Sequence, residues 1–228
     1  MSGPTIIISL VFSALLIWQW KRYQHLRRDK FIREAPFPKG LLERLGKHHP
    51  QLEQKDLALV SRALRQYFLT YHHSGCKRVS MPSQVADDLW HEFILYTRHY
   101  EIFCKQAFGQ FFHHTPAVVL GSDKRDNEGL RRVWWHACKE ENINPRDAAR
   151  LPLLFAIDAK LGVADAFVYS LNCKKDAANG TSGSSCCAGD FGDASIDGGL
   201  DGFGDGGGDA IGGGGDSGCG GGGCGGGD

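Results

Sequence analysis

The sequence predicts an all-α protein with a single N-terminal transmembrane helix, a compact helical domain and a disordered Gly/Asp-rich C-terminal tail. Three observations support this prediction. The first 20 residues contain no charged side chain, and the middle of the chain repeats apolar residues every three or four positions. The last 53 residues hold 23 of the 31 glycines and nine aspartates, but no Lys, Arg or Glu. The formal net charge of zero therefore combines +9 before Asp176 with −9 from Asp176 to the end of the sequence.

These features divide the chain into four predicted parts. They are a transmembrane anchor over 1–20, a basic juxtamembrane linker over 21–39, a helical domain over 40–173 and a Gly/Asp/Cys-rich tail over 174–228. A tail of this composition lacks the apolar residues needed for a core, so only one modest domain is expected.

The segment Ile6–Trp20 is apolar except for two Ser and one Gln. Counted from Pro4, the stretch has 17 residues, which is near the lower limit for a helix that crosses a bilayer. Trp18 and Trp20 fall where an interfacial aromatic belt is expected. Positive charge follows the apolar run, whereas in a cleaved signal peptide it precedes the run. We therefore expect an uncleaved, single-pass membrane anchor.

The segment Lys21–Arg33 carries a net charge of +5 and comes directly after the anchor. Basic residues beside a span stay in the cytoplasm, so the N-terminus is expected outside and the bulk of the chain in the cytoplasm. The same residues would lie at anionic lipid head groups, although a topology signal alone also explains them. In that reducing compartment the eight cysteines are not expected to form stable disulfides, and no Cys-x-x-Cys pair indicates a zinc ribbon.

The predicted helices of the domain follow from periodicity and from their end signals. Between 53 and 73, apolar residues such as Leu57, Leu64 and Tyr71 recur at helical spacing, and Ser74-Gly75 ends the pattern. Ser83 is a suitable N-cap for a long helix that runs to residue 108. That helix is apolar on most of its circumference, which predicts a place at the centre of the domain. The full set of predicted helices is 41–47, 53–73, 83–108, 126–141, 148–161 and 164–171.

Pro145 and the composition of the tail complete this interpretation. Pro145 suits the first turn of a helix, so the last part of the fold is expected to start near it. In the tail, Asp recurs close to every fourth residue from 190 to 209, which predicts disorder. Cys219 and Cys224 lie in almost pure glycine near the end of the chain.

One group of side chains indicates possible metal chemistry. Within DDLWHEF (87–93), Asp87 and Asp88 precede His91 by four and three residues, so they share its helix face. With His113 and His114 in the following loop, they form a candidate site for a divalent metal. The alternative is a buried, structural His91 that forms a hydrogen bond with a loop. The zinc-protease pattern fails because residue 95 is Leu, and no catalytic residue is predicted.

The string WHEFILYTRHYEIFCKQAFG (90–109) carries a spaced pattern of Trp90, His91, Tyr100, Cys104 and Gly109. It resembles the signature of the glycine-rich domain-containing protein-like family of plants and bacteria, over about residues 40–165. The resemblance implies a helical domain of unsettled biochemistry, and for plant relatives RNA binding through Gly-rich parts. The tail of this chain is acidic and has no Arg, so it would repel phosphates and no nucleic-acid partner is expected.

These observations predict a membrane-tethered helical interaction or scaffold module with a protein partner. One alternative is a metal-dependent enzyme or metal-binding protein that uses the Asp/His group. Another is a carrier of a modified or assembling Gly/Cys-rich tail.

Overall fold

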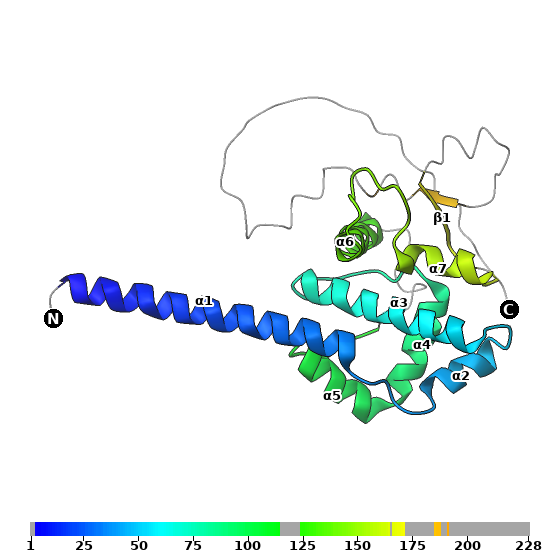
Figure 1. Cartoon of the computed structure of the whole chain (residues 1–228), viewed down its shortest axis with the longest axis horizontal. Coiled ribbons are helices and arrows are strands. Elements are labelled where there is room, and N and C mark those ends of the chain that lie inside the picture. Colours follow the sequence, from blue (N-terminus) through cyan, green and yellow to red (C-terminus); the bar gives the residue numbers. More distant parts are fainter. Residues whose placement is uncertain (1–2, 115–123, 165, 172–184, 188–190, 192–228) are drawn as a thin grey trace.

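The computed structural model describes residues 3–114, 124–164, 166–171, 185–187 and 191. In these residues the chain is mostly helical, with one long helix that extends from a helical body (Figure 1). The helices are α1 (Gly3–Glu34), α2 (Leu41–His48), α3 (Gln54–His73), α4 (Gln84–Leu95), α5 (Thr97–Ala107), α6 (Lys124–Glu140) and α7 (Leu153–Leu161). Two short strands, β1 (Val168–Ser170) and β2 (Ser185–Cys187), pair in parallel.

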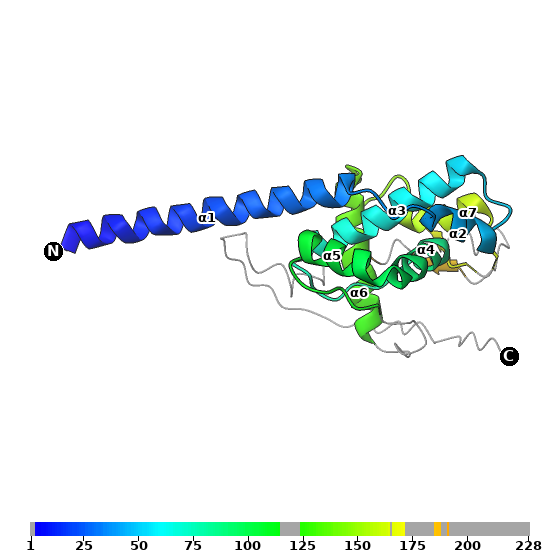
Figure 2. The same cartoon turned by 90° about the horizontal axis from the view of Figure 1, so that it is seen from below.

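Helix α1 continues without a break from the predicted anchor into the segment expected as a linker, as far as Glu34. Its first half projects away from the body, and its last turns lie against it (Figure 2). Ile32 is fully buried in the core, whereas Leu10 and Leu15 are more than half exposed. Pro36 and Pro38 follow its end, and Arg65 of α3 donates hydrogen bonds to the carbonyls of Ile32 and Ala35. By length and composition alone, α1 is apolar enough to cross a membrane.

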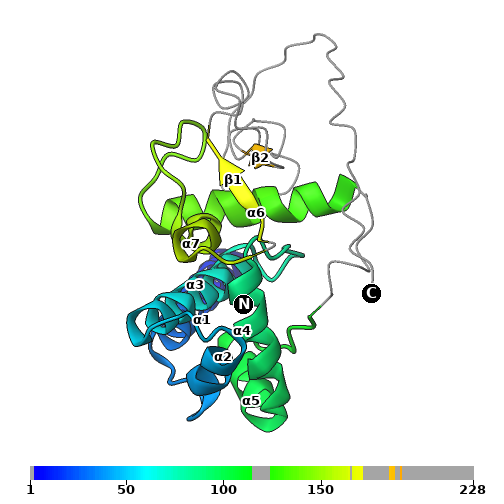
Figure 3. The same ribbon diagram turned by 90° about the vertical axis from the view of Figure 1, so that its right-hand side faces the viewer.

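The body is built in three layers around α3 (Figure 3). Helices α6 and α7 lie on one side of α3, and α2, α4 and α5 lie on the other. All residues from Gln66 to His72 are buried, so the second half of α3 has no solvent-facing side. The central helix is therefore α3, and the prediction that 83–108 occupies the centre was wrong.

The predicted helix 83–108 is two helices joined by a bend at Tyr96, whose φ and ψ are −81° and 56°. Ser83 caps α4 as predicted, because its hydroxyl accepts a hydrogen bond from the amide of Ala86. The bend leaves Leu95 62% exposed but lets both halves bury aromatic residues against α3. Packing of these rings therefore overrides the continuous helical pattern.

The later elements also differ from the prediction. No helix starts at Pro145; α7 starts at Leu153, directly after Pro152. The segment 164–171 contains β1 in place of a helix. Phe191, which was expected in the disordered tail, is buried against Trp134 and Phe155. Strand β2 (Ser185–Cys187) also falls in the segment expected as a disordered tail, so the prediction was wrong there. The other tail predictions, including those for Cys219 and Cys224, lie outside the described residues.

Remote side chains cap the amino ends of α4 and α7. The buried carboxylate of Asp158, on α7, accepts hydrogen bonds from the Ser83 hydroxyl at 2.7 Å and the Gln84 and Val85 amides at 2.6 and 3.2 Å. At the start of α7, the Leu153 amide donates a hydrogen bond at 2.6 Å to the carboxylate of Glu141, which directly follows α6. Each cap satisfies helix amides that have no partner within their own helix and fixes one helix against another.

Replacement of Asp158 by Ala should destabilise the fold by about 2–3 kcal/mol, because it leaves buried donors at the start of α4 unpaired. Urea unfolding of the full chain in mild detergent measures this loss. The exposed Asp147→Ala variant is the matched control and should change stability by less than about 0.5 kcal/mol. Equal effects of the two variants would contradict the role given to this cap.

Candidate metal-binding site

Asp87, His91 and His114 meet at the surface between α4 and the segment that follows α5. The Nε2 atom of His114 lies 2.8 Å from Oδ1 of Asp87, and Nδ1 of His91 lies 3.6 Å from Oδ2 of the same carboxylate. One possible ligand atom from each residue lies within 4.8 Å of the other two. Donor atoms around one zinc ion are roughly 3.3 Å apart, so small side-chain rotations would bring these three to that spacing.

The site is closed on one side and open on the other. The side chain of His114 is 10% exposed and that of Asp87 is 21% exposed, whereas His91 is 51% exposed. The indole of Trp90 meets the His114 ring edge-on, with centroids 4.5 Å apart. A ligand could therefore approach from solvent past His91 while His114 stays packed against the domain.

Two of the five predicted ligands lie elsewhere. Asp88 turns toward α2, where Oδ2 lies 2.8 Å from Nε2 of His49, and it also accepts a hydrogen bond from Gln84 at 3.0 Å. His113 is exposed and contacts the ring of Phe111. The structure thus brings together Asp87, His91 and His114 and separates Asp88 and His113 from them; metal binding itself stays a prediction.

His49 is the partner that the sequence interpretation missed. It is 39 residues from Asp88 in the sequence, so no local spacing pattern indicates the contact. Its neighbour His48 lies 3.2 Å from Glu92, which also binds Arg44. These contacts join α2 to α4 and hold the helix that carries Asp87 and His91.

The other motif residues hold the segment that carries His114. The indole of Trp90 donates a hydrogen bond to the Tyr100 hydroxyl at 3.1 Å, and that hydroxyl donates to the carbonyl of Phe112. Trp90 and Tyr100 are both buried, so each polar atom of this relay depends on the next one. The relay fixes Phe112 two residues before His114.

Cys104 and Gly109 shape the end of α5. Cys104 is fully buried, and burial raises the pKa of its thiol, which makes it a core residue in place of a nucleophile. Gly109 has a φ of +78°, and a Cβ there would lie 2.5 Å from Nη2 of Arg28. Arg28 of α1 also donates to the carbonyl of Phe108. The left-handed turn favours glycine at this position, and the Arg28 guanidinium lies where a side chain would begin.

A cavity of about 730 Å³ lies apart from this site, between α3, α6 and α7. Its lining contains Arg33 and Arg150, but these guanidinium groups already bind Glu140 and Glu141. The cavity holds none of the predicted ligands. We therefore base the functional argument on the Asp/His group and its contacts.

Comparison with known proteins gave one match. The family described as UCP032817-like matches residues 27–191, so the matched part starts within α1 and ends at the buried Phe191. A family of unknown function agrees with the resemblance drawn from the Trp90–Gly109 motif, but the match does not support the glycine-rich family specifically. No curated protein and no solved structure matches the chain.

Replacement of Tyr100 by Phe should destabilise the protein by about 1–3 kcal/mol, because it leaves the Trp90 indole N–H and the Phe112 carbonyl unpaired in the core. Urea unfolding in mild detergent measures this change. Tyr96→Phe is the control, because the Tyr96 hydroxyl makes only a 3.4 Å contact with the Lys39 carbonyl near solvent. A loss in Tyr96→Phe as large as in Tyr100→Phe would exclude a special role for the relay.

Proposed function

Because the chain belongs to the UCP032817-like family, which carries no assigned activity, we propose its function from the site: it is a membrane-tethered helical domain that binds one divalent transition-metal ion through Asp87, His91 and His114. The observation that carries this proposal is the spacing of the three ligand atoms, all within 4.8 Å of one another. Two imidazoles and one carboxylate are ligands that suit zinc and other first-row metals.

The ligands come from a rigid frame, which favours metal binding over a chance contact. Asp87 and His91 are one turn apart on α4, and the Trp90–Tyr100–Phe112 relay holds the segment of His114. Three protein ligands leave a coordination position for water, as in catalytic zinc sites, whereas structural sites are closed by a fourth protein ligand. The exposed side of His91 is where such a water would enter.

Helix α1 supplies the tether in this proposal. The side chains Ile6, Ile7, Ile8, Leu16 and Ile17 are each 45% exposed or more, and the 100° step between helical residues places them on all sides of the helix. A helix that is apolar all round and has no protein cover suits a lipid environment better than water. We place the N-terminus outside and the domain in the cytoplasm, since basic residues follow the span.

The exposed basic side chains beside the span define the proposed lipid contact. Lys21, Arg22, Arg27 and Lys30 face solvent along α1. Arg33 binds Asp29 and Glu140, so it serves the attachment of α1 to the domain. Anionic head groups would thus meet four of the six basic residues between Lys21 and Arg33.

The second candidate function is a tethered interaction or scaffold module without metal chemistry. The observation that favours it is exposed apolar surface on the domain near the α4–α5 bend, where Leu95 is 62% and Phe111 is 45% exposed. The two candidates make opposite predictions for metal content. Absence of stoichiometric metal, together with no change in stability on chelation, would favour the scaffold.

The purified full chain should bind one equivalent of Zn²⁺, and the ion should raise its melting temperature because only the folded protein gathers the ligands. Asp87→Asn and His114→Gln should each weaken binding by about tenfold or more, as measured by competition with a zinc indicator. Asp88→Asn and His113→Gln are adjacent, matched controls and should bind as the wild type does. Equal losses in all four variants, or none in any, would overturn the proposed ligand set.

The full chain should stay in the membrane fraction after an alkaline wash, and a C-terminal reporter should be active only in its cytoplasmic form. Leu10→Arg/Leu15→Arg should release the chain, because each charge at the centre of a span costs about 2.5–3.5 kcal/mol on insertion scales. Leu26→Arg, outside the span, is the control and should stay membrane-bound. Release of the wild type by the wash, or reporter activity outside the cell, would contradict this topology.

A further inference from the structure

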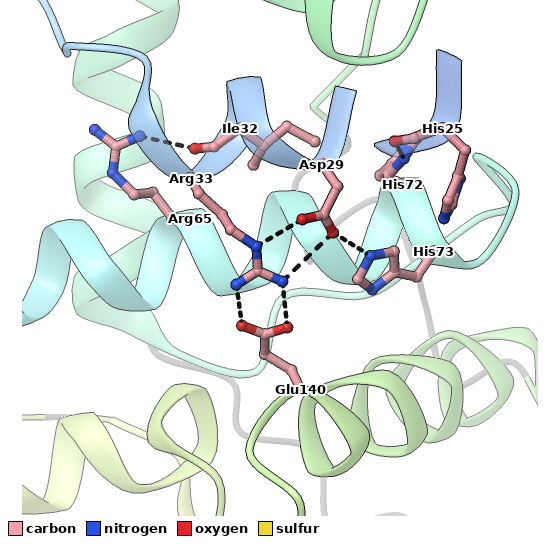
Figure 4. Close-up of polar contacts among 8 residues, drawn as sticks. All are labelled: His25, Asp29, Ile32, Arg33, Arg65, His72, His73 and Glu140. Atoms are coloured by element: carbon pink, nitrogen blue, oxygen red, sulfur yellow. Dashed lines mark hydrogen bonds and ion pairs between the residues drawn. The ribbon is translucent and has the colours of Figure 1, made fainter. Parts of the chain in front are cut away.

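Four histidines and one aspartate meet where α1 lies against the body, and none of them belongs to the Asp87–His91–His114 site. The rings of His25 (α1) and His72 (α3) stack with centroids 4.3 Å apart (Figure 4). His73 lies next to them, and its ring centroid is 6.2 Å from that of His136 on α6. We call this group the junction cluster; its members are His25, Asp29, His72, His73 and His136.

The hydrogen bonds of the junction cluster fit neutral His72. Its Nε2 atom lies 3.1 Å from the His25 carbonyl oxygen, which only accepts, so this nitrogen carries the proton of the neutral ring. Nε2 of His73 lies 2.6 Å from Oδ2 of Asp29 (Figure 4). A second proton on His72 would place a full charge on a 5% exposed residue whose ring is stacked on another imidazole.

The surroundings of the junction cluster offer little unpaired negative charge. Arg28 comes from α1, and Arg132 and Lys139 come from α6, so cations reach the cluster from both sides. The nearby acids are Asp29 on α1 and Glu140 on α6, and Arg33 binds both of them. A protonated His73 would face Asp29, but a second proton on His72 or His136 would meet neighbouring histidines, and His136 also faces Arg132 and Lys139. Asp29 is the acid that acts on His72, and Arg33 and His73 already bind it.

The physical result is that α1 packs against the body with uncharged histidines. Burial, with His25 as the next cause, lowers the pKa of His72 to about 4. Burial, followed by the charge of His73, lowers the pKa of His136 to about 4. Both values lie below the ordinary 6.5 of a free histidine, so docking is at full strength above pH 6.5 and weakens as the pH falls toward 4.

We propose that the junction cluster is a proton-sensitive latch that fixes α1 to α3 and α6 when neutral and releases the His25 part of α1 when protonated. The Arg33–Glu140 pair, the bonds from Arg65 to the end of α1 and the bond from Arg28 to the Phe108 carbonyl contain no histidine, so they persist at about pH 5. The part of α1 before Arg28 then pivots about this retained segment, and the body changes its angle to the proposed membrane helix. This inference needs no metal ion and goes beyond the proposed metal binding.

Distance measurement between two spin labels tests the latch. The labels are introduced at Tyr23, which is exposed on α1, and at Lys105, which is exposed on α5, after replacement of Cys76 and the cysteines beyond residue 172 by Ser. The full chain is placed in phosphatidylcholine nanodiscs with a chelator, so that metal binding cannot affect the result. We expect one narrow distance at about pH 7.5 and a broad, shifted distribution at about pH 5. The ratio of docked to released chains should be about tenfold lower at the lower pH.

The double variant His72→Gln/His136→Gln should keep the narrow distance at both pH values. The amide side chain introduced by His72→Gln can still donate a hydrogen bond to the His25 carbonyl, but it cannot gain a proton. His99→Gln, at an exposed position of α5, is the matched control and should respond to pH as the wild type does.

Three outcomes would overturn the latch. The first is a distance distribution of the wild type that stays unchanged between the two pH values. The second is a double variant that shifts as the wild type does, which would place the pH response in other groups. The third is loss of the helical circular-dichroism signal at the lower pH, because protons would then unfold the domain in place of releasing α1.

Discussion

The relay from the Trp90 indole through the Tyr100 hydroxyl to the Phe112 carbonyl is the constraint on which the α4–α5 layer and the site depend. In a straight helix the Trp90 and Tyr100 backbones would be about 15 Å apart along the axis. Because the chain bends at Tyr96, the Trp90 indole and the Tyr100 hydroxyl can form a hydrogen bond. Both side chains are then buried with their polar atoms paired. Because an unpaired buried donor is costly, the relay fixes the bend and the segment that leads to His114 together.

The helices with one clear apolar face were the easiest to predict. The periodicity of α3 and the short α2 placed both within a residue of their observed ends, and Ser83 marked the start of α4. The helix predictions were wrong where contacts between distant segments determine the backbone conformation. The bend at Tyr96 depends on which aromatic rings reach α3, and the start of α7 depends on Glu141 and Gln66, which are remote from it in the sequence.

The candidate site, too, could be predicted only in part from the sequence. Helical spacing showed that a carboxylate and His91 share a face, but two adjacent aspartates were equally suitable by spacing alone. The structure separates them because α2 brings His49 to Asp88, while the segment after α5 brings His114 to Asp87. The junction cluster was not predicted at all, since its histidines come from three helices that are distant in the sequence.

The unbroken course of α1 has a mechanical consequence. From Trp20 to Ile32 the helix rises about 18 Å, with no proline or glycine along the way. In the proposed membrane orientation, and while the junction cluster is neutral, it acts as a stiff stalk, which sets the height of the domain above the lipid and limits its rotation. The open side of His91 would then stay within a narrow range of distances from the bilayer surface. Ligands that are present at that distance would reach it more readily than others.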